Sequence, residues 1–250
     1  MDEERLKMES PPIIYRSLKD CVMDYLREEM ETGNLKPGER INEKEICQKL
    51  GISRTPIREA LIQLEREGFI EISPRKSIRV KKLTLEEIED IYNVVGTLEA
   101  EAAEVACDRL TPEDIAKMEE KFEQMAEALA KDDFKKYMEI NLDLHNIHLR
   151  LCGNAVLQAI VNQLKKRLYD FPRIMLTLPD WEEKCMAEHR QLIRYFKEKN
   201  KPAIKDLIKN KHWDFEDNKK FILVYYDLLN AKKAKDTSRQ SLLPKQGTVK

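Results

Sequence analysis

The chain has 250 residues, of which 36% are charged and 42% hydrophobic, and its formal net charge is −1. This length suits one large domain or two of ordinary size, and a content of only 7 Gly and 10 Pro argues against a turn-rich β sandwich. No apolar run approaches the roughly 20 residues that cross a bilayer, and the acidic N-terminus lacks the hydrophobic core of a signal peptide. The five cysteines form no Cys-x-x-Cys pair, which favours reduced thiols and excludes a zinc finger. We therefore expect a cytoplasmic protein with no membrane partner.

The charge is distributed unevenly along the chain. Residues 1–32 carry a net −4, residues 33–83 a net +5, residues 84–230 a net −7 and residues 231–250 a net +5. The near-zero total therefore hides a basic segment, an acidic segment and a basic tail. This asymmetry indicates two domains with different partners. The total charge alone argues against a nucleic-acid partner, but the basic segment is compatible with one.

Residues 13–83 carry the pattern of a small domain with three helices and a β ribbon. Apolar residues recur at helical spacing in three segments, each of which ends next to a glycine. Asn42 and Ser53 stand where N-caps are preferred, and Pro56 falls in the first turn of the third helix. The pattern predicts helices over 13–31, 42–50 and 53–67, and a two-stranded ribbon from short runs at 69–72 and 78–81.

After residue 83 the pattern is helical throughout. Thr84 and Glu87 have the spacing of a capping box, and no strand signal follows. The predicted helices are 84–109, 112–130, 133–152, 155–178, 181–199 and 202–230, which together form a bundle. The fold class is thus mainly α, and we divide the chain into an N-terminal extension (1–12), a first domain (13–83), a helical domain (84–230) and a basic tail that we predict to be disordered (231–250).

The elements of residues 33–83 follow the order of a winged helix-turn-helix. If the apolar residues of the third helix face the core, Arg54, Thr55 and Arg58 point outward near its N-terminus, the end that enters the major groove in such motifs. A guanidinium there binds guanine O6 and N7 or a phosphate, while Ser53, Thr55 and the free N–H groups of the first turn suit phosphate oxygens. The ribbon adds Arg75, Lys76 and Arg79. Ordinary solvated arginines are the alternative, and the spacing, the glycine turn and the local charge of +5 argue against it.

Three stretches of this domain resemble the GntR family of transcription regulators. They are GERINEKEI (38–46), LGISRTPIREAL (50–61) and LEREGFI (64–70), within a resemblance that covers residues 13–83. The resemblance implies that Arg40, at the start of the second helix, contacts DNA together with Ser53, Arg54, Thr55 and Arg58. The family usually has Gly after a basic pair at the wing tip, and here Ser77 follows Arg75 and Lys76.

The histidines of the helical half suggest a metal site. His145, His148, His189 and His212 lie on three predicted helices, and imidazoles from separate bundle helices can converge on one ion. Asn141 is four residues before His145, hence on the same helix face. A bundle with ordinary packed histidines is the alternative.

The helical half also resembles the FCD ligand-binding domain of the FadR-like subfamily. The resemblance rests on Leu98-Glu99, on His145 ahead of Gly153-Asn154, and on Glu188-His189. It implies a divalent metal of the zinc or nickel class and a small carboxylate effector. The implied ligands are His145, His189, His212 and Asn141, which stands where the family has Asp.

Two positions depart from the pattern that this resemblance implies. His212 is one residue beyond its expected place, as a single inserted residue near Lys201-Pro202 would produce, and His148 is outside the pattern, so we expect it to be exposed or simply packed. The family often has an Arg four residues before Glu99, where this chain has Val95. The replacement partners for an effector carboxylate are Arg150, Arg167 and Arg173, among which the sequence does not choose.

These patterns favour a DNA-binding transcription regulator that is not an enzyme. One recognition helix reads only a few bases, so we expect a homodimer on a palindromic operator, with the helical domain providing dimerisation and effector binding. The alternative is a metal-dependent hydrolase with an accessory DNA-binding domain. No His-Glu-x-x-His, Gly-x-Ser-x-Gly or phosphate loop supports that alternative, and a helical scaffold protein leaves the residues from Ser53 to Ala60 unexplained.

Overall fold

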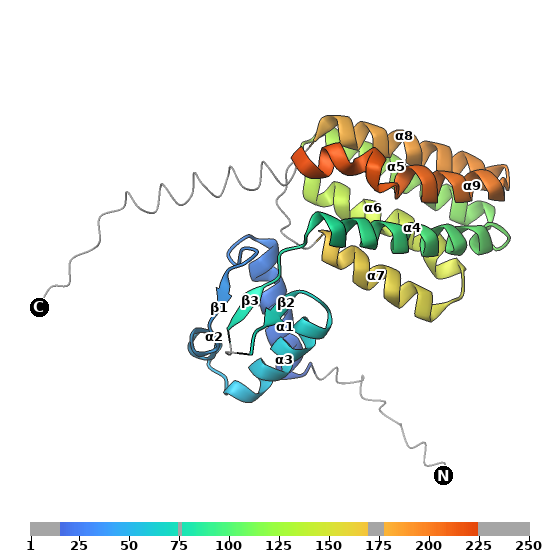
Figure 1. The fold of residues 1–250 in the computed structure, drawn as a ribbon. Helices are drawn as coiled ribbons and strands as arrows, with labels where there is room; N and C mark the ends of the chain where they lie inside the picture. The colour runs from blue at the N-terminus through green and yellow to red at the C-terminus, as the bar shows by residue number, and fades with distance from the viewer. Residues whose placement is uncertain (1–15, 75–76, 170–177, 225–250) are drawn as a thin grey trace, which may run out of the picture. The chain divides into compact units, whose positions relative to one another are not determined.

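The computed structural model describes residues 16–74, 77–169 and 178–224 (Figure 1). The chain divides into two compact units, one within residues 1–81 and the other within residues 82–250. The predicted fold class is confirmed, because a small three-helix unit with a β-sheet precedes an all-helical unit. No helix within the described ranges is long and apolar enough to span a membrane. The N-terminal extension and the basic tail lie outside these ranges.

The first unit contains the three predicted helices, α1 (Leu18–Glu31), α2 (Glu43–Leu50) and α3 (Arg54–Arg66). The apolar stripe of α3 faces the core as predicted, since these side chains are buried: Ile57, Ala60, Leu61 and Leu64. Gly51 ends α2 in the left-handed conformation with φ 67°, which lets the chain turn at once into α3. The turn thereby determines the direction in which α3 starts relative to α2.

The sheet of the first unit has three strands rather than the predicted two. Strands β1 (Arg40–Ile41), β3 (Ile78–Val80) and β2 (Ile70–Ile72) pair antiparallel in that order. Arg40 therefore lies on a strand, and the prediction that it starts the second helix is wrong. A two-residue strand carries too little alternation to be detected in sequence, although Ile41 is buried and Arg40 is exposed, as strand geometry requires.

The second unit is a bundle of helices (Figure 1). They are α4 (Leu85–Cys107), α5 (Pro112–Ala130), α6 (Phe134–Leu151), α7 (Ala155–Tyr169), α8 (Pro179–Lys197) and α9 (Lys201–Leu207). Capping boxes begin α4 at Thr84, as the sequence predicts, and α5 at Thr111. Helix α4 packs against α6, α7 and α9, so its buried face lines the interior that these helices share.

The last predicted helix, 202–230, is wrong as a single element. Helix α9 ends at Leu207, a π-helical turn follows (η1, Ile208–His212), and the chain bends before helix resumes at 215–224. The N–H of Trp213 donates to the carbonyl of Ile208, five residues earlier, at 2.9 Å. A π turn holds one residue more than an α turn. An extra residue of this kind, directly before His212, is consistent with the expected one-residue offset of that histidine.

Gly96 on α4 makes close packing with Trp213 possible. A Cβ added at Gly96 lies only 2.7 Å from Cβ of Trp213. Overpacking costs about 1–3 kcal/mol, which exceeds the roughly 1 kcal/mol that Ala gains over Gly in a helix. We expect Gly96→Ala to lower the free energy of unfolding by about 1 kcal/mol in urea titrations, and Thr97→Ser, at the exposed neighbouring position, to change it by less than about 0.5 kcal/mol. A Gly96→Ala protein as stable as the wild type contradicts this packing constraint.

Candidate functional site

The N-terminal half of α3 presents a polar surface. Ser53, Arg54, Thr55 and Arg58 are exposed, opposite the buried stripe, as the sequence predicts. Ser53 occupies the N-cap position, with no side-chain capping bond to the residues that the structure describes. First-turn N–H groups, exposed hydroxyls and arginines at one helix N-terminus are groups that suit phosphate oxygens.

Arg40 joins this surface from strand β1. Arg40, Arg54 and Arg58 line one open hollow of about 700 Å³, whose apolar wall includes Leu61. Nε of Arg58 lies 3.3 Å from Oε2 of Glu43, which holds the guanidinium toward α2. The structure thus brings Arg40 together with Arg54 and Arg58, which follow it by 14 and 18 residues in the sequence, on a concave surface between β1, α2 and α3.

The wing is closed at its base by two serines. The N–H of Ser73 donates to the carbonyl of Ser77 at 2.9 Å, and the N–H of Ser77 donates to Oγ of Ser73 at 3.2 Å. Arg79 donates to the carbonyl of Gly38 at 2.9 Å, so its guanidinium braces the turn before β1. Arg75 and Lys76, the predicted wing-tip contacts, lie outside the described residues.

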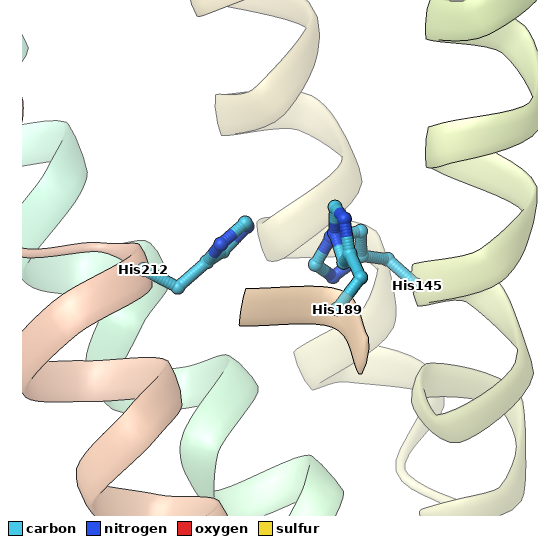
Figure 2. A group of neighbouring side chains, drawn as sticks. All are labelled: His145, His189 and His212. Atoms are coloured by element: carbon cyan, nitrogen blue, oxygen red, sulfur yellow. The ribbon is translucent and has the colours of Figure 1, made fainter. Parts of the chain in front are cut away.

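Three of the four predicted metal ligands converge inside the second unit. One ring nitrogen of each histidine, His145 on α6, His189 on α8 and His212 at the end of η1, lies within 4.8 Å of the others (Figure 2). The Nε2 atoms of His145 and His189 are 2.9 Å apart. Asn141 is buried one turn before His145, and its Oδ1 has no hydrogen-bond partner in the described part of the chain.

A buried carboxylate, Glu99 on α4, holds His145 from the other side. Glu99 is 0% exposed and has four donors. Nδ1 of His145 and Nε2 of His148 (3.1 Å) donate to its Oε1, while Nζ of Lys165 (2.7 Å) and Nε1 of Trp213 (3.1 Å) donate to its Oε2. His148 is therefore packed in the interior, which is one of the two expected outcomes, and it belongs to the hydrogen-bond network of Glu99. Burial alone raises the pKa of Glu99, but Lys165 and the two imidazoles outweigh burial and hold that pKa well below its ordinary value.

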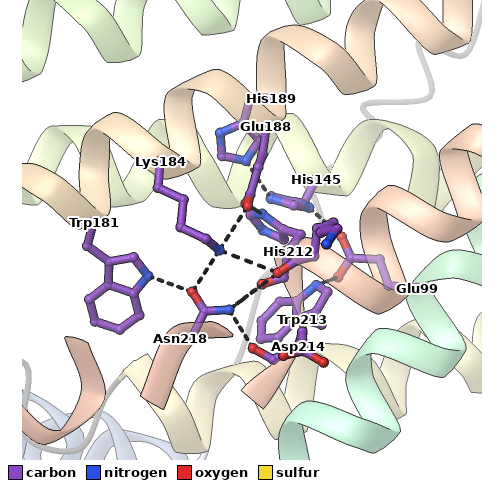
Figure 3. Close-up of polar contacts among 11 residues, drawn as sticks. Glu99, His145, Trp181, Lys184, Glu188, His189, His212, Trp213, Asp214 and Asn218 are labelled. Carbon is purple, nitrogen blue, oxygen red and sulfur yellow. Dashed lines mark hydrogen bonds and ion pairs between the residues drawn. The ribbon is translucent and has the colours of Figure 1, made fainter. Parts of the chain in front are cut away.

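A second carboxylate, Glu188 on α8, holds His212 (Figure 3). Its Oε2 accepts from Nδ1 of His212 at 2.8 Å, and its Oε1 from Nζ of Lys184 at 2.8 Å. Lys184 also donates to Oδ1 of Asn218 at 3.1 Å, which accepts from the Trp181 indole at 3.1 Å. Burial raises the pKa of Glu188, and the His212 and Lys184 contacts outweigh it and lower that pKa. Both histidine-binding carboxylates are therefore ionised at neutral pH.

The imidazoles in the interior are neutral. Burial lowers the pKa of His145 to about 3 against the opposing effect of Glu99, and it lowers the pKa of His148 and His189 as well. A neutral imidazole keeps the lone pair that metal coordination needs. Nδ1 of His189, like Oδ1 of Asn141, is buried without a hydrogen-bond partner among the described residues. This set of nitrogen and oxygen donors fits a divalent metal ion.

The structure changes the list of cations that face the interior. Arg150 is exposed and Arg167 only half-buried, while Arg173 lies outside the described residues. Within the described ranges, the buried cation is Lys165, 3% exposed, which the sequence prediction does not include. Its position was readable, because Lys165 follows the buried Val161 by one helical turn on α7.

Together, these observations define a class of protein: a DNA-binding winged helix-turn-helix unit joined to a helical ligand-binding unit. Residues 18–80 match the profile of the bacterial regulatory proteins of the gntR family, and residues 90–212 match that of the FCD domain. The chain belongs to the GntR family, and it is a DNA-binding transcription regulator with an FCD effector-binding domain.

Relatives and solved structures agree with this assignment. The HTH-type transcriptional regulator YdhC of Bacillus subtilis is 28% identical over 209 residues, 82% of this chain and 89% of the relative. The Nta operon transcriptional regulator of Aminobacter aminovorans is 31% identical over 162 residues, 64% of this chain and 73% of the relative. The structure of E. coli McbR/YncC has the same fold, with a TM-score of 0.66 at 24% identity over 86% of this chain and 100% of that one. The relatives are regulators and not enzymes, which sets the hydrolase alternative aside.

The Glu99–Lys165 pair yields a stability prediction. Lys165→Met leaves the carboxylate of Glu99 buried without its ammonium partner, and breaking a buried pair in this way costs about 3–5 kcal/mol. We expect a loss of that size in urea unfolding, and recovery of most of it in the Glu99→Gln/Lys165→Met double variant, which buries no charge at either position. Lys166→Met, at the exposed neighbouring position, is the matched control. Equal stability of the Lys165→Met and Lys166→Met proteins contradicts the role of the pair.

Proposed function

We propose that this regulator binds a palindromic operator as a homodimer and that a divalent metal in its helical unit helps to bind a small carboxylate effector. The arginine-lined hollow beside α3 supports the DNA contacts. The single observation that carries the metal is the convergence of His145, His189 and His212, from three separate elements, within 4.8 Å.

On the DNA side, we assign base and groove contacts to Arg54 and Arg58. The salt bridge between Arg58 and Glu43 is partly exposed and therefore weak, so Arg58 can exchange it for a guanine or a phosphate. Hydroxyls and flanking cations then position the backbone of the duplex. The proposed DNA contacts are Arg40, Ser53, Arg54, Thr55, Arg58, Arg75, Lys76 and Ser77.

The dimer follows from the size of the recognition element. One helix N-terminus reads too few base pairs to select a genomic site, whereas two copies on a palindrome double the contacts. Apolar side chains stay exposed on the adjacent helices α4 and α7, namely Val94, Val156 and Ile160. These side chains support a second copy packing on the helical unit.

In the helical unit, the three histidines are the residues that would hold the ion, with Oδ1 of Asn141 as the oxygen donor. When bound, the ion supplies a positive Lewis-acidic centre that a carboxylate can coordinate. Because Asn141 is neutral where the family has Asp, the ligand set adds no negative charge and attracts an anion more strongly. The ligands come from α6, α8 and η1, so an effector that binds one arrangement of these elements more tightly shifts the unit toward it.

The DNA assignment predicts that Arg54→Ala/Arg58→Ala loses operator binding. Each arginine is worth about 1–3 kcal/mol, so the double variant should bind an operator selected by the wild type at least about 30-fold more weakly, with a shallower salt dependence. Fluorescence anisotropy titrations at several salt concentrations measure both quantities. Arg66→Ala, exposed in the last turn of the same helix, is the control. Unchanged affinity with an unchanged salt slope rules the assignment out.

The metal assignment predicts about one divalent ion per chain in purified protein. We expect His145→Ala to abolish binding and His148→Gln to retain it, because His148 contacts Glu99 and lies outside the ligand trio. Elemental analysis after dialysis, followed by reloading with zinc or nickel, makes the measurement. If the wild type holds no ion before or after reloading, the metal part of the proposal fails.

A further inference from the structure

The same three-residue arrangement occurs twice around the histidine trio. In the first, Lys165 pairs with Glu99, whose other oxygen accepts from Nδ1 of His145. In the second, Lys184 pairs with Glu188, whose other oxygen accepts from Nδ1 of His212 at 2.8 Å (Figure 3). Each is a lysine–glutamate–histidine series in which the carboxylate bridges an ammonium group and an imidazole.

A carboxylate bound in this way determines which imidazole nitrogen carries the proton. An ionised carboxylate only accepts, so the nitrogen that faces it must be the N–H. A neutral imidazole has one N–H, and placing it on Nδ1 leaves the lone pair on Nε2. In metalloproteins, the partner of the second ring nitrogen fixes tautomer and ring orientation in the same manner.

We propose that Glu99 and Glu188 are positioning residues that hold His145 and His212 in the Nδ1–H tautomer and aim both Nε2 lone pairs at one cation site. Lys165 and Lys184 fix the two carboxylates in place. The functional meaning of this arrangement rests on the proposed metal site. The tautomers themselves are a property of the metal-free chain.

The third imidazole lacks such a series. Nε2 of His189 is 2.9 Å from Nε2 of His145, and its Nδ1 has no hydrogen-bond partner in the ranges that the structure describes. Because Nε2 of His145 holds a lone pair, His189 is the donor in this contact. Two ligands are therefore prearranged by carboxylates, while the proton of His189 is the one that has to leave the space between the rings.

The second series is anchored beyond the pair itself. Asn218 accepts from Lys184 and donates to the carbonyls of His212 at 3.2 Å and Asp214 at 2.7 Å. The orientation of His212 thus depends on α8, on the bend after η1 and on helical residues 215–224 at once. Hydrogen bonds from several elements to one residue restrict the rotation of its side chain.

The cluster of Glu99, His145 and His148 is not a second cation site in this arrangement. These groups also have ligand atoms within 4.8 Å of one another. However, Oε2 of Glu99 is occupied by Lys165 and by the Trp213 indole, and the ammonium group repels a cation there. The cluster therefore orients His145 and does not compete with the trio for metal.

Glu188→Gln tests the inference sharply. The ammonium of Lys184 needs an oxygen, so the amide turns its oxygen to Lys184 and its NH2 to His212, where Nδ1 must then accept. We expect ring ¹⁵N–¹H spectra of the chelator-treated full chain to show the Nδ1–H tautomer at His145 and His212 in the wild type and the Nε2–H tautomer at His212 in Glu188→Gln. Zinc affinity, measured by competition with a chelating dye, should fall about 10- to 100-fold.

The control is Glu182→Gln on the same helix. Glu182 is also buried, but its Oε1 accepts from the N–H of Leu178 and not from a histidine. We expect its tautomers and zinc affinity to match the wild type. Should Glu188→Gln fail to fold, Lys184→Met/Glu188→Met removes the acceptor of His212 together with its ammonium partner, and His212 should then no longer hold the Nδ1–H tautomer alone.

The outcomes separate this inference from the metal proposal. An Nε2–H tautomer at His212 in the wild type, or unchanged tautomer and zinc affinity in folded Glu188→Gln, overturns the inference and leaves the metal site standing. The expected tautomers in a wild-type chain that binds no zinc support the inference on orientation and overturn the metal proposal instead.

Discussion

The interior of the helical unit depends on one constraint, the fully buried charge of Glu99. An unpaired carboxylate at that depth costs several kcal/mol, so every donor that satisfies it is held in position. The donors come from α6, from α7 and from the residue that follows η1, while Glu99 itself lies on α4. One side chain therefore links four segments of the bundle and sets the orientation of His145, the residue at which the carboxylate network meets the histidine trio.

The π turn helps to satisfy the buried carboxylate of Glu99. It ends at His212, and the next residue is Trp213, so two consecutive side chains reach the interior: one joins the trio and the other donates to Glu99. Gly96 leaves the space on α4 that the indole occupies. The irregular turn thus carries two side chains of the interior network, His212 of the proposed metal site and Trp213.

Sequence patterns predicted the helices whose positions follow from a regular apolar periodicity and from N-cap residues. The capping box at Thr84 predicted the start of α4, and the apolar stripe of α3 predicted the exposed face of Arg54 and Arg58. The resemblance supplied the histidine trio, which periodicity alone does not distinguish from core residues. Strand β1 was missed because two residues are too few to show the alternation of a strand. The π turn was missed because one additional residue in a turn does not produce a recognisable periodicity. Lys165 was missed because a lysine in a basic run is usually solvated, although its place after Val161 pointed inward.

The charge balance of the proposed metal site follows from these same residues. Each carboxylate beside the trio is matched by its own lysine, Glu99 by Lys165 and Glu188 by Lys184. The imidazoles of His145 and His189 are neutral, and Asn141 brings no charge. A divalent ion held there keeps its two positive charges uncompensated, in a buried setting where Coulomb attraction is strong. A neutral effector gains little from such a centre, whereas an anionic one neutralises it. The selectivity that we propose for a carboxylate therefore comes from the ligand set and its paired surroundings, without an arginine at the position of Val95.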